Sequence, residues 1–311
     1  MFRVTVAALL ALASCGRSRG VPDEDLGNLV KAPADNATPV KVARAASVPA
    51  ELSRALTQSL TTVVSALGPH TVKVATSTTI DEAGAVTDDL KDETVIEIGA
   101  QDAFHGLYTN TADYGREVIF VGGTMYLRPR YQKWHGRAPE GSDEPAQQRD
   151  SFYTGVAATW DLLAPGVELI DKGAVNVAGR PGRKIQIEKA PKAGTNPAEK
   201  LTQRKWRETR VVEDVSGEVV LDVDKGVPLS VQLAGTITFM REGRRFKMKT
   251  SVTSTVLALA MPDIAAPVPE EVVSTPGRLR EVEERDELLK GIAPPQRKVE
   301  TTTGSQPGAT K

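Results

Sequence analysis

Cysteine is nearly absent from this sequence. Of its 311 residues one is a cysteine, Cys15, so no disulfide can form within the chain. Thiol catalysis is also excluded if Cys15 is consumed as an anchor, as argued below. Even in a compartment that permits disulfides, none can add to the stability of this fold, so the core alone must stabilise it.

Charge of either sign is not in excess, and aromatic residues are few. The chain has 39 basic and 40 acidic residues, for a formal net charge of −1. A nucleic-acid partner would need a strong basic excess, and so would a purely electrostatic membrane binder.

Aromatic residues make up 5% of the chain. Because few large rings fill little volume, this scarcity mildly favours a roomy interior.

Catalytic and metal-binding motifs are missing as well. The histidines are His70, His105 and His135, and none has another His, Cys or carboxylate at metal-ligand spacing. We interpret each as an exposed or half-buried structural residue. No nucleophile elbow, Walker loop or dinucleotide fingerprint occurs. The sequence therefore predicts no catalytic residue, no metal site, no cofactor and no enzyme activity.

A long hydrophobic run is absent too, since the apolar stretch at residues 4–12 is far shorter than the about 20 residues of a membrane-spanning helix. It suits a signal peptide over residues 1–14. Residues 12–15, Leu-Ala-Ser-Cys, resemble the lipobox of bacterial lipoproteins. The resemblance implies cleavage before Cys15 and its modification by acyl chains such as palmitate. The alternative is an ordinary secretory signal, because residues 11–13, Ala-Leu-Ala, fit small-x-small cleavage.

The residue after Cys15 bears on location. In lipoproteins of two-membrane bacteria an Asp at this place favours the inner membrane, whereas here it is Gly16. The resemblance thus implies a lipid-anchored envelope protein, facing the periplasm from the outer membrane.

Residues 15–46 have no apolar periodicity and predict a lipidated N-terminus with a flexible tether. A folded domain over 47–260 follows. Its first element is a helix at about 49–67 with one apolar stripe. A second amphipathic helix is expected at about 146–163. Residues 261–311 predict a Pro-rich segment, a short charged helix beginning near Thr275 and a disordered tail.

Between and after these helices the apolar period is two, which indicates strands. The expected strands are 70–80, 94–98, 106–111, 117–121, 125–127, 167–177, 183–189, 205–214, 217–224, 227–240 and 245–259. Short turns such as Gly122-Gly123 join several of them, so the strands should form an antiparallel meander.

The fold class predicted is α+β, mainly β: a curved antiparallel half-barrel sheet covered by an N-terminal helix and an inserted helix. The apolar sheet face must be covered. If the helices cover it loosely, an apolar cavity for acyl chains results, and if they cover it fully, the core is closed. The expected lining of such a cavity comes from the second helix and the last two strands: Phe152, Val156, Trp160, Leu229, Val231, Leu233, Ile237, Phe239, Phe246 and Met248.

The order of these elements resembles the lipoprotein-carrier superfamily, that is LolA/LolB and the LppX/LprG-like proteins, over roughly residues 49–259. The resemblance rests on the helix before the first strand, the hairpin at residues 118–127 (VIFVGGTMYL) and the helical insertion at 146–163. It implies an incomplete antiparallel barrel with a helical lid.

Two functions are expected from these features. The first is an envelope lipoprotein that binds a lipid or acylated ligand in an apolar cavity, as a carrier or chaperone without catalysis. The second is a structural or assembly-partner lipoprotein of the outer membrane that acts through protein–protein contacts. Its partners would be the membrane, through N-terminal acyl chains, and lipid, acylated protein or other envelope proteins, but no nucleic acid. An enzyme, the third possibility weighed, would need a polar cleft with converging titratable groups.

Overall fold

The computed structural model describes residues 40–274. The predicted signal peptide, Cys15, most of the predicted tether and the predicted charged helix lie outside the described residues. Within residues 40–274, none of the helices is long and apolar enough to cross a membrane.

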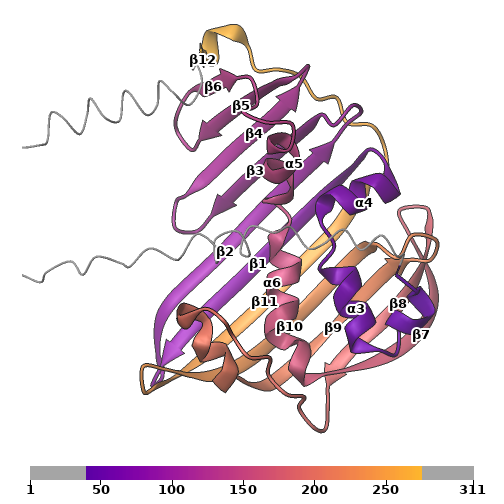
Figure 1. Ribbon diagram of the computed structural model, residues 1–311, viewed down its shortest axis with the longest axis vertical. Helices are drawn as coiled ribbons and strands as arrows, with labels where there is room; N and C mark the ends of the chain where they lie inside the picture. The colour runs from indigo at the N-terminus through magenta and orange to yellow at the C-terminus, as the bar shows by residue number, and fades with distance from the viewer. Residues whose placement is uncertain (1–39, 275–311) are drawn as a thin grey trace, which may run out of the picture.

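Twelve strands form one sheet, with helices on one of its faces (Figure 1). The strands are β1 His70–Glu82, β2 Ala85–Ile98, β3 Phe104–Asn110, β4 Gly115–Val121, β5 Thr124–Pro129, β6 Trp134–Arg137, β7 Val167–Val177, β8 Arg180–Lys189, β9 Val211–Asp222, β10 Pro228–Arg241, β11 Arg244–Ala258 and β12 Val272–Ser274. The helices are α2 Val42–Ala45, α3 Pro49–Leu56, α4 Leu60–Leu67, α5 Glu144–Asp150 and α6 Thr154–Leu163, with 3-10 turns η1 Ala164–Gly166, η2 Thr202–Thr209 and η3 Pro269–Glu271.

The strand order is β12-β6-β5-β4-β3-β2-β1-β11-β10-β9-β8-β7. All neighbours are antiparallel except β12 and β6, which are parallel. Two meanders, β1–β6 and β7–β11, are joined where the first strand pairs with the eleventh. The sheet stays open because its edge strands are β12 and β7. The predicted fold class, a mainly β protein with a curved open sheet and a helical cover, is confirmed.

The inner face of the sheet follows the predicted alternation. On β10 the side chains of Leu233 and Ile237 are buried opposite Val252 and Met248 of β11. They belong to one core cluster that also contains α3, α4 and α6. The helices therefore close the core along this face, as Figure 1 shows for α6 and α3 in front of β9–β11.

Each predicted long helix is divided in two. The first breaks into α3 and α4 because Ser59 acts as an N-cap: its side chain accepts a hydrogen bond from the Thr62 backbone N–H at 3.2 Å. The second breaks into α5 and α6 at residues 151–153. This break turns the chain so that α6 lies across the sheet while α5 packs beside α4.

Four strand and boundary expectations need correction. The predicted strands 205–214 and 217–224 are in fact η2 followed by the single strand β9. The strand predicted at 94–98 extends back to Ala85, because β2 pairs along its whole length with β1. At the N-terminal end, Val42 and Ala45 are buried in the core, so packed structure begins before residue 47. After residue 260 the chain returns to the sheet as β12.

Candidate ligand pocket at the start of α6

Eight of the ten residues predicted to line a cavity belong to one core cluster and Phe246 packs against it, whereas Leu229 is buried outside that cluster. Nine of the ten are buried and Phe246 is half-buried. Phe152 and α6 pack tightly on the sheet at three places where glycine allows close approach. A Cβ on Gly235 would lie 2.5 Å from Leu163 of α6, and a Cβ on Gly106 would lie 2.8 Å from the Phe152 ring. Similarly, a Cβ on Gly155 would lie 2.7 Å from Thr76 on β1. Side chains therefore fill the space between α6 and the sheet at these contacts.

Phe239 and Phe246 have a cover that the sequence did not predict. Trp206 of η2 packs on Phe239 with ring centroids 4.4 Å apart, and Phe239 stacks on Phe246 at 5.5 Å. Because residues 205–214 were expected to be a strand, this aromatic cover was missed. The far end of the sheet face is thus closed by η2 rather than by α6.

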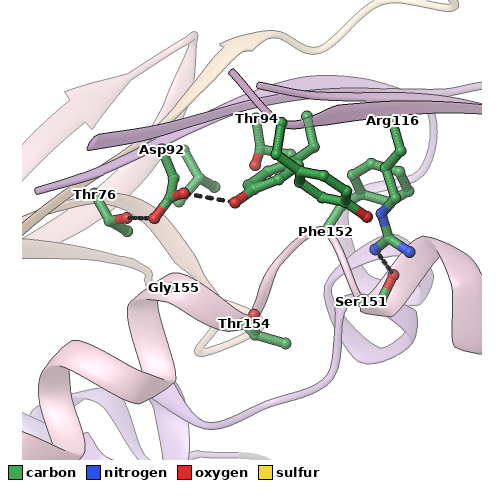
Figure 2. A pocket seen from close by; sticks show the side chains of 11 residues that line it. Thr76, Asp92, Thr94, Arg116, Ser151, Phe152, Thr154 and Gly155 are labelled. Atoms are coloured by element: carbon green, nitrogen blue, oxygen red, sulfur yellow. Dashed lines mark hydrogen bonds between the residues drawn. The ribbon is translucent and has the colours of Figure 1, made fainter. Parts of the chain in front are cut away.

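A half-open cavity of about 310 Å³ lies at the other end of α6 (Figure 2). Its walls come from β1, β2, β3, β4 and the junction of α5 and α6. The lining residues are Val74, Thr76, Asp92, Thr94, Tyr108, Tyr114, Arg116, Ser151, Phe152, Thr154 and Gly155. Of the ten residues predicted for the cavity, Phe152 alone contributes to this pocket, and it also belongs to the core.

One wall of the pocket is a hydrogen-bonded carboxylate. Asp92 accepts a hydrogen bond from the Thr76 hydroxyl at 3.0 Å and another from the Tyr108 hydroxyl at 2.6 Å. Asn110 in turn donates its side-chain amide to the Tyr108 oxygen at 3.1 Å. Burial and the Asp92 hydrogen bond raise the pKa of Tyr108, so the phenol keeps its proton and remains a donor. The Asp92 charge is thereby solvated by protein hydroxyls.

The opposite wall is a guanidinium. Arg116 lies over the Phe152 ring, with its Cζ 4.6 Å from the ring centroid, and donates to the Ser151 hydroxyl at 2.6 Å. The ring itself is pressed against Gly106. Arg116 is therefore positioned by the α5–α6 junction rather than by a carboxylate. Figure 2 shows Asp92 and Arg116 on opposite sides of the cluster of rings.

The sequence contained part of the signal for this pocket. On β2, Asp92 and Thr94 share a face with the buried Ile96 and Ile98, so a polar inner face could be expected once the full strand is known. The predicted strand began at residue 94 and left Asp92 out. Arg116 likewise preceded its predicted strand, which began at Glu117.

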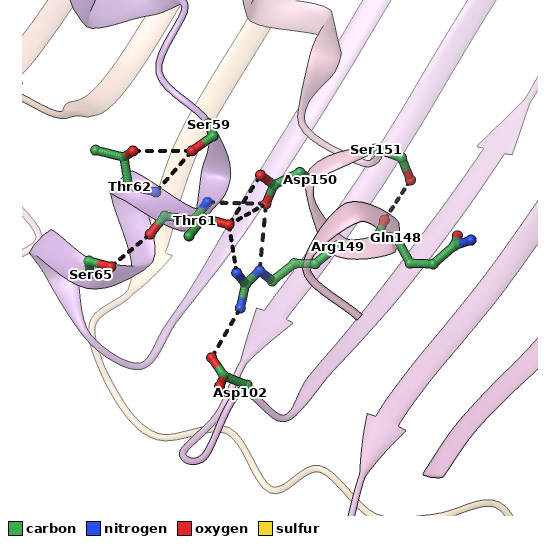
Figure 3. Close-up of polar contacts among 9 residues, drawn as sticks. All are labelled: Ser59, Thr61, Thr62, Ser65, Asp102, Gln148, Arg149, Asp150 and Ser151. Atoms are coloured by element: carbon green, nitrogen blue, oxygen red, sulfur yellow. Dashed lines mark hydrogen bonds and ion pairs between the residues drawn. The ribbon is translucent and has the colours of Figure 1, made fainter. Parts of the chain in front are cut away.

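Polar contacts tie α5 to α4 beside the pocket (Figure 3). Asp150 accepts hydrogen bonds from the Thr61 backbone N–H and hydroxyl at 3.1–3.2 Å. The buried Arg149 donates to the Thr61 hydroxyl at 2.9 Å and lies 3.6 Å from Asp102. Burial raises the pKa of Asp150 although Arg149 opposes the shift. These contacts anchor α5, whereas α6 is held mainly by apolar packing.

The histidines lie away from the pocket. His70 is fully buried, contrary to the expectation of an exposed or half-buried side chain, and its Nδ1 donates to the Gly68 carbonyl at 2.7 Å. Burial lowers its pKa. His105 is half-buried as expected. No group of three or more His, Cys, Asp or Glu side chains in residues 40–274 is arranged to hold a metal ion.

On the outer face, His105 bridges two carboxylates, at 2.9 Å from Glu97 and 2.8 Å from Glu117. The hydrogen bond to Glu117 raises the pKa of His105, with Glu97 adding to the shift against the effect of burial. Because the pKa of His105 is higher in the folded than in the unfolded state, the stabilisation that its two carboxylate contacts give the fold is complete below about pH 6.5. It is lost as pH rises through the folded-state pKa.

We therefore expect His105→Gln to destabilise the protein by roughly 1 kcal/mol more at pH 5.5 than at pH 8.5, measured by urea unfolding. The difference should vanish in a Glu97→Gln/Glu117→Gln background, where no carboxylate is left to pair. An equal loss of stability at both pH values in the otherwise native chain would contradict this assignment.

No protein-family model matches the sequence, and no curated protein matches it. Among solved structures, LprF from Mycobacterium bovis is similar with a TM-score of 0.25 and 10% identity, over 70% of this chain and 97% of that one. LppX from Mycobacterium tuberculosis matches with a TM-score of 0.24 and 15% identity, over 66% and 94%. MucB matches with a TM-score of 0.20 and 16% identity over 67% of this chain, and the match spans 62% of the MucB chain, less than two thirds.

A LolA superfamily protein from Nitrosomonas europaea also matches, at 6% identity and a TM-score of 0.19. The solved structures that match thus include members of the superfamily that the sequence resembles. With identities and TM-scores this low, the description of the fold rests on the strand order and register given above.

Proposed function

We propose that this chain is an envelope lipoprotein that binds a lipid or acylated ligand between α6 and the inner face of the sheet, without covalent chemistry. The observation that carries the proposal is the position of Phe152. Its ring is one wall of the 310 Å³ pocket and is also part of the apolar core under the helices. A displacement of Phe152 and α6 would therefore extend the pocket into the apolar face.

The pocket, at about 310 Å³, lies at the lower end of the range of about 300–1,000 Å³ that is common for drug-sized ligands, so a whole lipid needs additional space. An acyl chain has to replace the side chains of α6 that now cover the sheet. The side chains buried there are Val156, Trp160 and Leu163. Burial of each contributes about 1.5–3 kcal/mol to the free energy of folding, or roughly 5–9 kcal/mol for the three together. Each buried CH₂ of a ligand contributes about 0.8 kcal/mol, so a chain of 12–16 carbons, at roughly 10–13 kcal/mol, can offset the displacement of α6.

Native mass spectrometry tests the proposal. The chain lacking residues 1–20 is purified, incubated with palmitate or a palmitoyl lysophospholipid and desolvated gently. We expect a 1:1 adduct, because one continuous apolar face can accept one chain. The absence of any adduct, together with no lipid in an organic extract of the protein, would sink the proposal.

The alternative is a lipoprotein that acts through protein–protein contacts and takes no lipid. The close packing of Leu163 on Gly235 and of Phe152 on Gly106 favours it, because a permanently filled core leaves no room for a chain. Envelope anchoring through Cys15 is common to both functions. It is tested by loss of radiolabelled palmitate incorporation in Cys15→Ser.

A further inference from the structure

Arg116 differs from the other arginines around it. Arg130 pairs with Asp113 at 3.1 Å and Arg128 with Glu117. Arg149 lies 3.6 Å from Asp102. Within residues 40–274 no carboxylate lies within ion-pair distance of Arg116, whose contacts are the Ser151 hydroxyl and the Phe152 ring. Of the five N–H donors of a guanidinium, the Ser151 bond uses one.

The place of Arg116 in the fold explains why its side chain lines the pocket. It stands on the inner face of β4, opposite Tyr108 of β3, and both side chains line the cavity. The Phe152 ring lies against the guanidinium from the side of α6, with Cζ 4.6 Å from the ring centroid. A guanidinium that lies over a ring in a half-open cavity, with one hydrogen bond made by its five N–H donors, is suited to bidentate binding of a carboxylate or phosphate.

The other charged group of the pocket does not compete for this role. Both oxygens of Asp92 already accept hydrogen bonds, from Thr76 and Tyr108. The beginning of α6 adds to the positive potential, because Thr154 and Gly155 line the pocket and no side chain caps this helix. Arg116 is therefore the charged group of this cavity whose hydrogen-bonding capacity is largely unused.

We infer that the pocket receives the anionic group of an amphipathic ligand, a carboxylate or a phosphate, on the guanidinium of Arg116. The inference deepens the proposed function and rests on it. The anionic end of the ligand lies between Arg116 and the start of α6, and its acyl chain runs past Phe152 under α6. The ligand class is then an anionic lipid or an acyl chain that bears an acidic group, rather than a neutral lipid.

The test compares ligands that share one acyl chain. The chain lacking residues 1–20 is titrated calorimetrically, below micelle-forming concentrations, with dodecyl phosphate, with dodecyl maltoside and with inorganic phosphate. We expect about tenfold tighter binding of dodecyl phosphate than of dodecyl maltoside, the factor that one charge-assisted contact of about 1.4 kcal/mol gives. Arg116→Gln should remove this preference and Arg116→Lys should keep part of it.

Arg130→Gln is the matched control, because it removes the same charge from the residue that follows β5, outside the lining of this pocket. It should retain the full preference. Thermal unfolding of each variant checks that the fold is intact. Equal binding of both amphiphiles by the native chain, or a preference that survives Arg116→Gln, would overturn the anion inference while the proposed function stands.

Two other results would separate the sources of the anion. Inorganic phosphate that binds as tightly as dodecyl phosphate, with loss in Arg116→Gln, would support the anion site and count against the acyl ligand. No binding of any of the three probes would overturn the inference and the proposed function together.

Discussion

Replacing Trp160 by alanine is expected to lower the free energy of unfolding by about 3–5 kcal/mol, the range for a large buried aromatic side chain. Trp160 is the largest fully buried side chain of α6, 1% exposed, and it packs in the core between the helices and the sheet. Its removal leaves a cavity where α6 meets the sheet, and the neighbouring glycine contacts already hold the backbones close. Urea unfolding followed by circular dichroism measures the loss.

Trp160→Phe is the control for this prediction. The indole Nε1 of Trp160 is buried without a hydrogen-bond partner in residues 40–274, so phenylalanine removes an unsatisfied donor together with some volume. These two effects oppose each other, and the expected loss is about 1 kcal/mol or less. A loss below 1 kcal/mol in Trp160→Ala would mean that α6 does not rest on the sheet in solution.

Local pattern was sufficient to predict much of the sheet. The hairpin of β4 and β5 follows from Gly122 and Gly123, whose φ angles of 58° and 77° are the left-handed values that a tight two-residue turn requires. The pairing of β10 with β11 follows from alternation on both sides of a short turn. In both cases the partners are close in sequence, so periodicity and turn residues decide the register.

Long-range pairing and helix breaks were harder to predict. The contact of β1 with β11 joins Val74 to Ser254, and no sequence pattern links strands so far apart. The start of β2 was also missed, because its first residues are exposed and carry no apolar period although they pair with β1, so Asp92 was excluded from its strand. Similarly, the break at Ser59 depends on one side-chain hydrogen bond that competes with an uninterrupted helix.

The sequence could predict which apolar residues cover the inner face of the sheet, but not whether a cavity lies between them and the helices. Eight of the ten apolar residues lie in the core cluster between the sheet and the helices and Phe246 packs against it, because strand and helix periods place them there. That they contact a ligand stays a prediction. An apolar stripe has the same pattern over an open or a filled space, and the closeness of α6 depends on Gly106 and Gly235. Arg116 was missed because its significance comes from the absence of a counter-charge in space.

Movement of α6 away from the sheet is the central requirement of the proposed function, and a reversible crosslink addresses it. A Cβ at Gly155 would lie 2.7 Å from the Cγ2 atom of Thr76. Cysteines at these two places fall within reach of a disulfide, whose Cβ atoms are about 3.5–4.5 Å apart. Because Cys15 is the one native cysteine, Cys15→Ser leaves the engineered pair as the sole thiols.

Thr76→Cys/Gly155→Cys should bind the palmitoyl lysophospholipid when reduced and lose at least about tenfold in affinity, or about 1.4 kcal/mol, when oxidised. The bond holds the first turn of α6 on β1 and keeps the acyl chain out. The same protein before and after reduction provides the comparison, and Cys15→Ser alone under the same oxidant shows whether oxidation itself affects binding.

The decisive measurement is therefore the affinity of the crosslinked protein for this lysophospholipid before and after reduction. Binding that is absent in the disulfide form and returns on reduction is the result that a displaceable α6 predicts. Equal binding in both forms would contradict it, because the ligand would then occupy a site that does not require α6 to move.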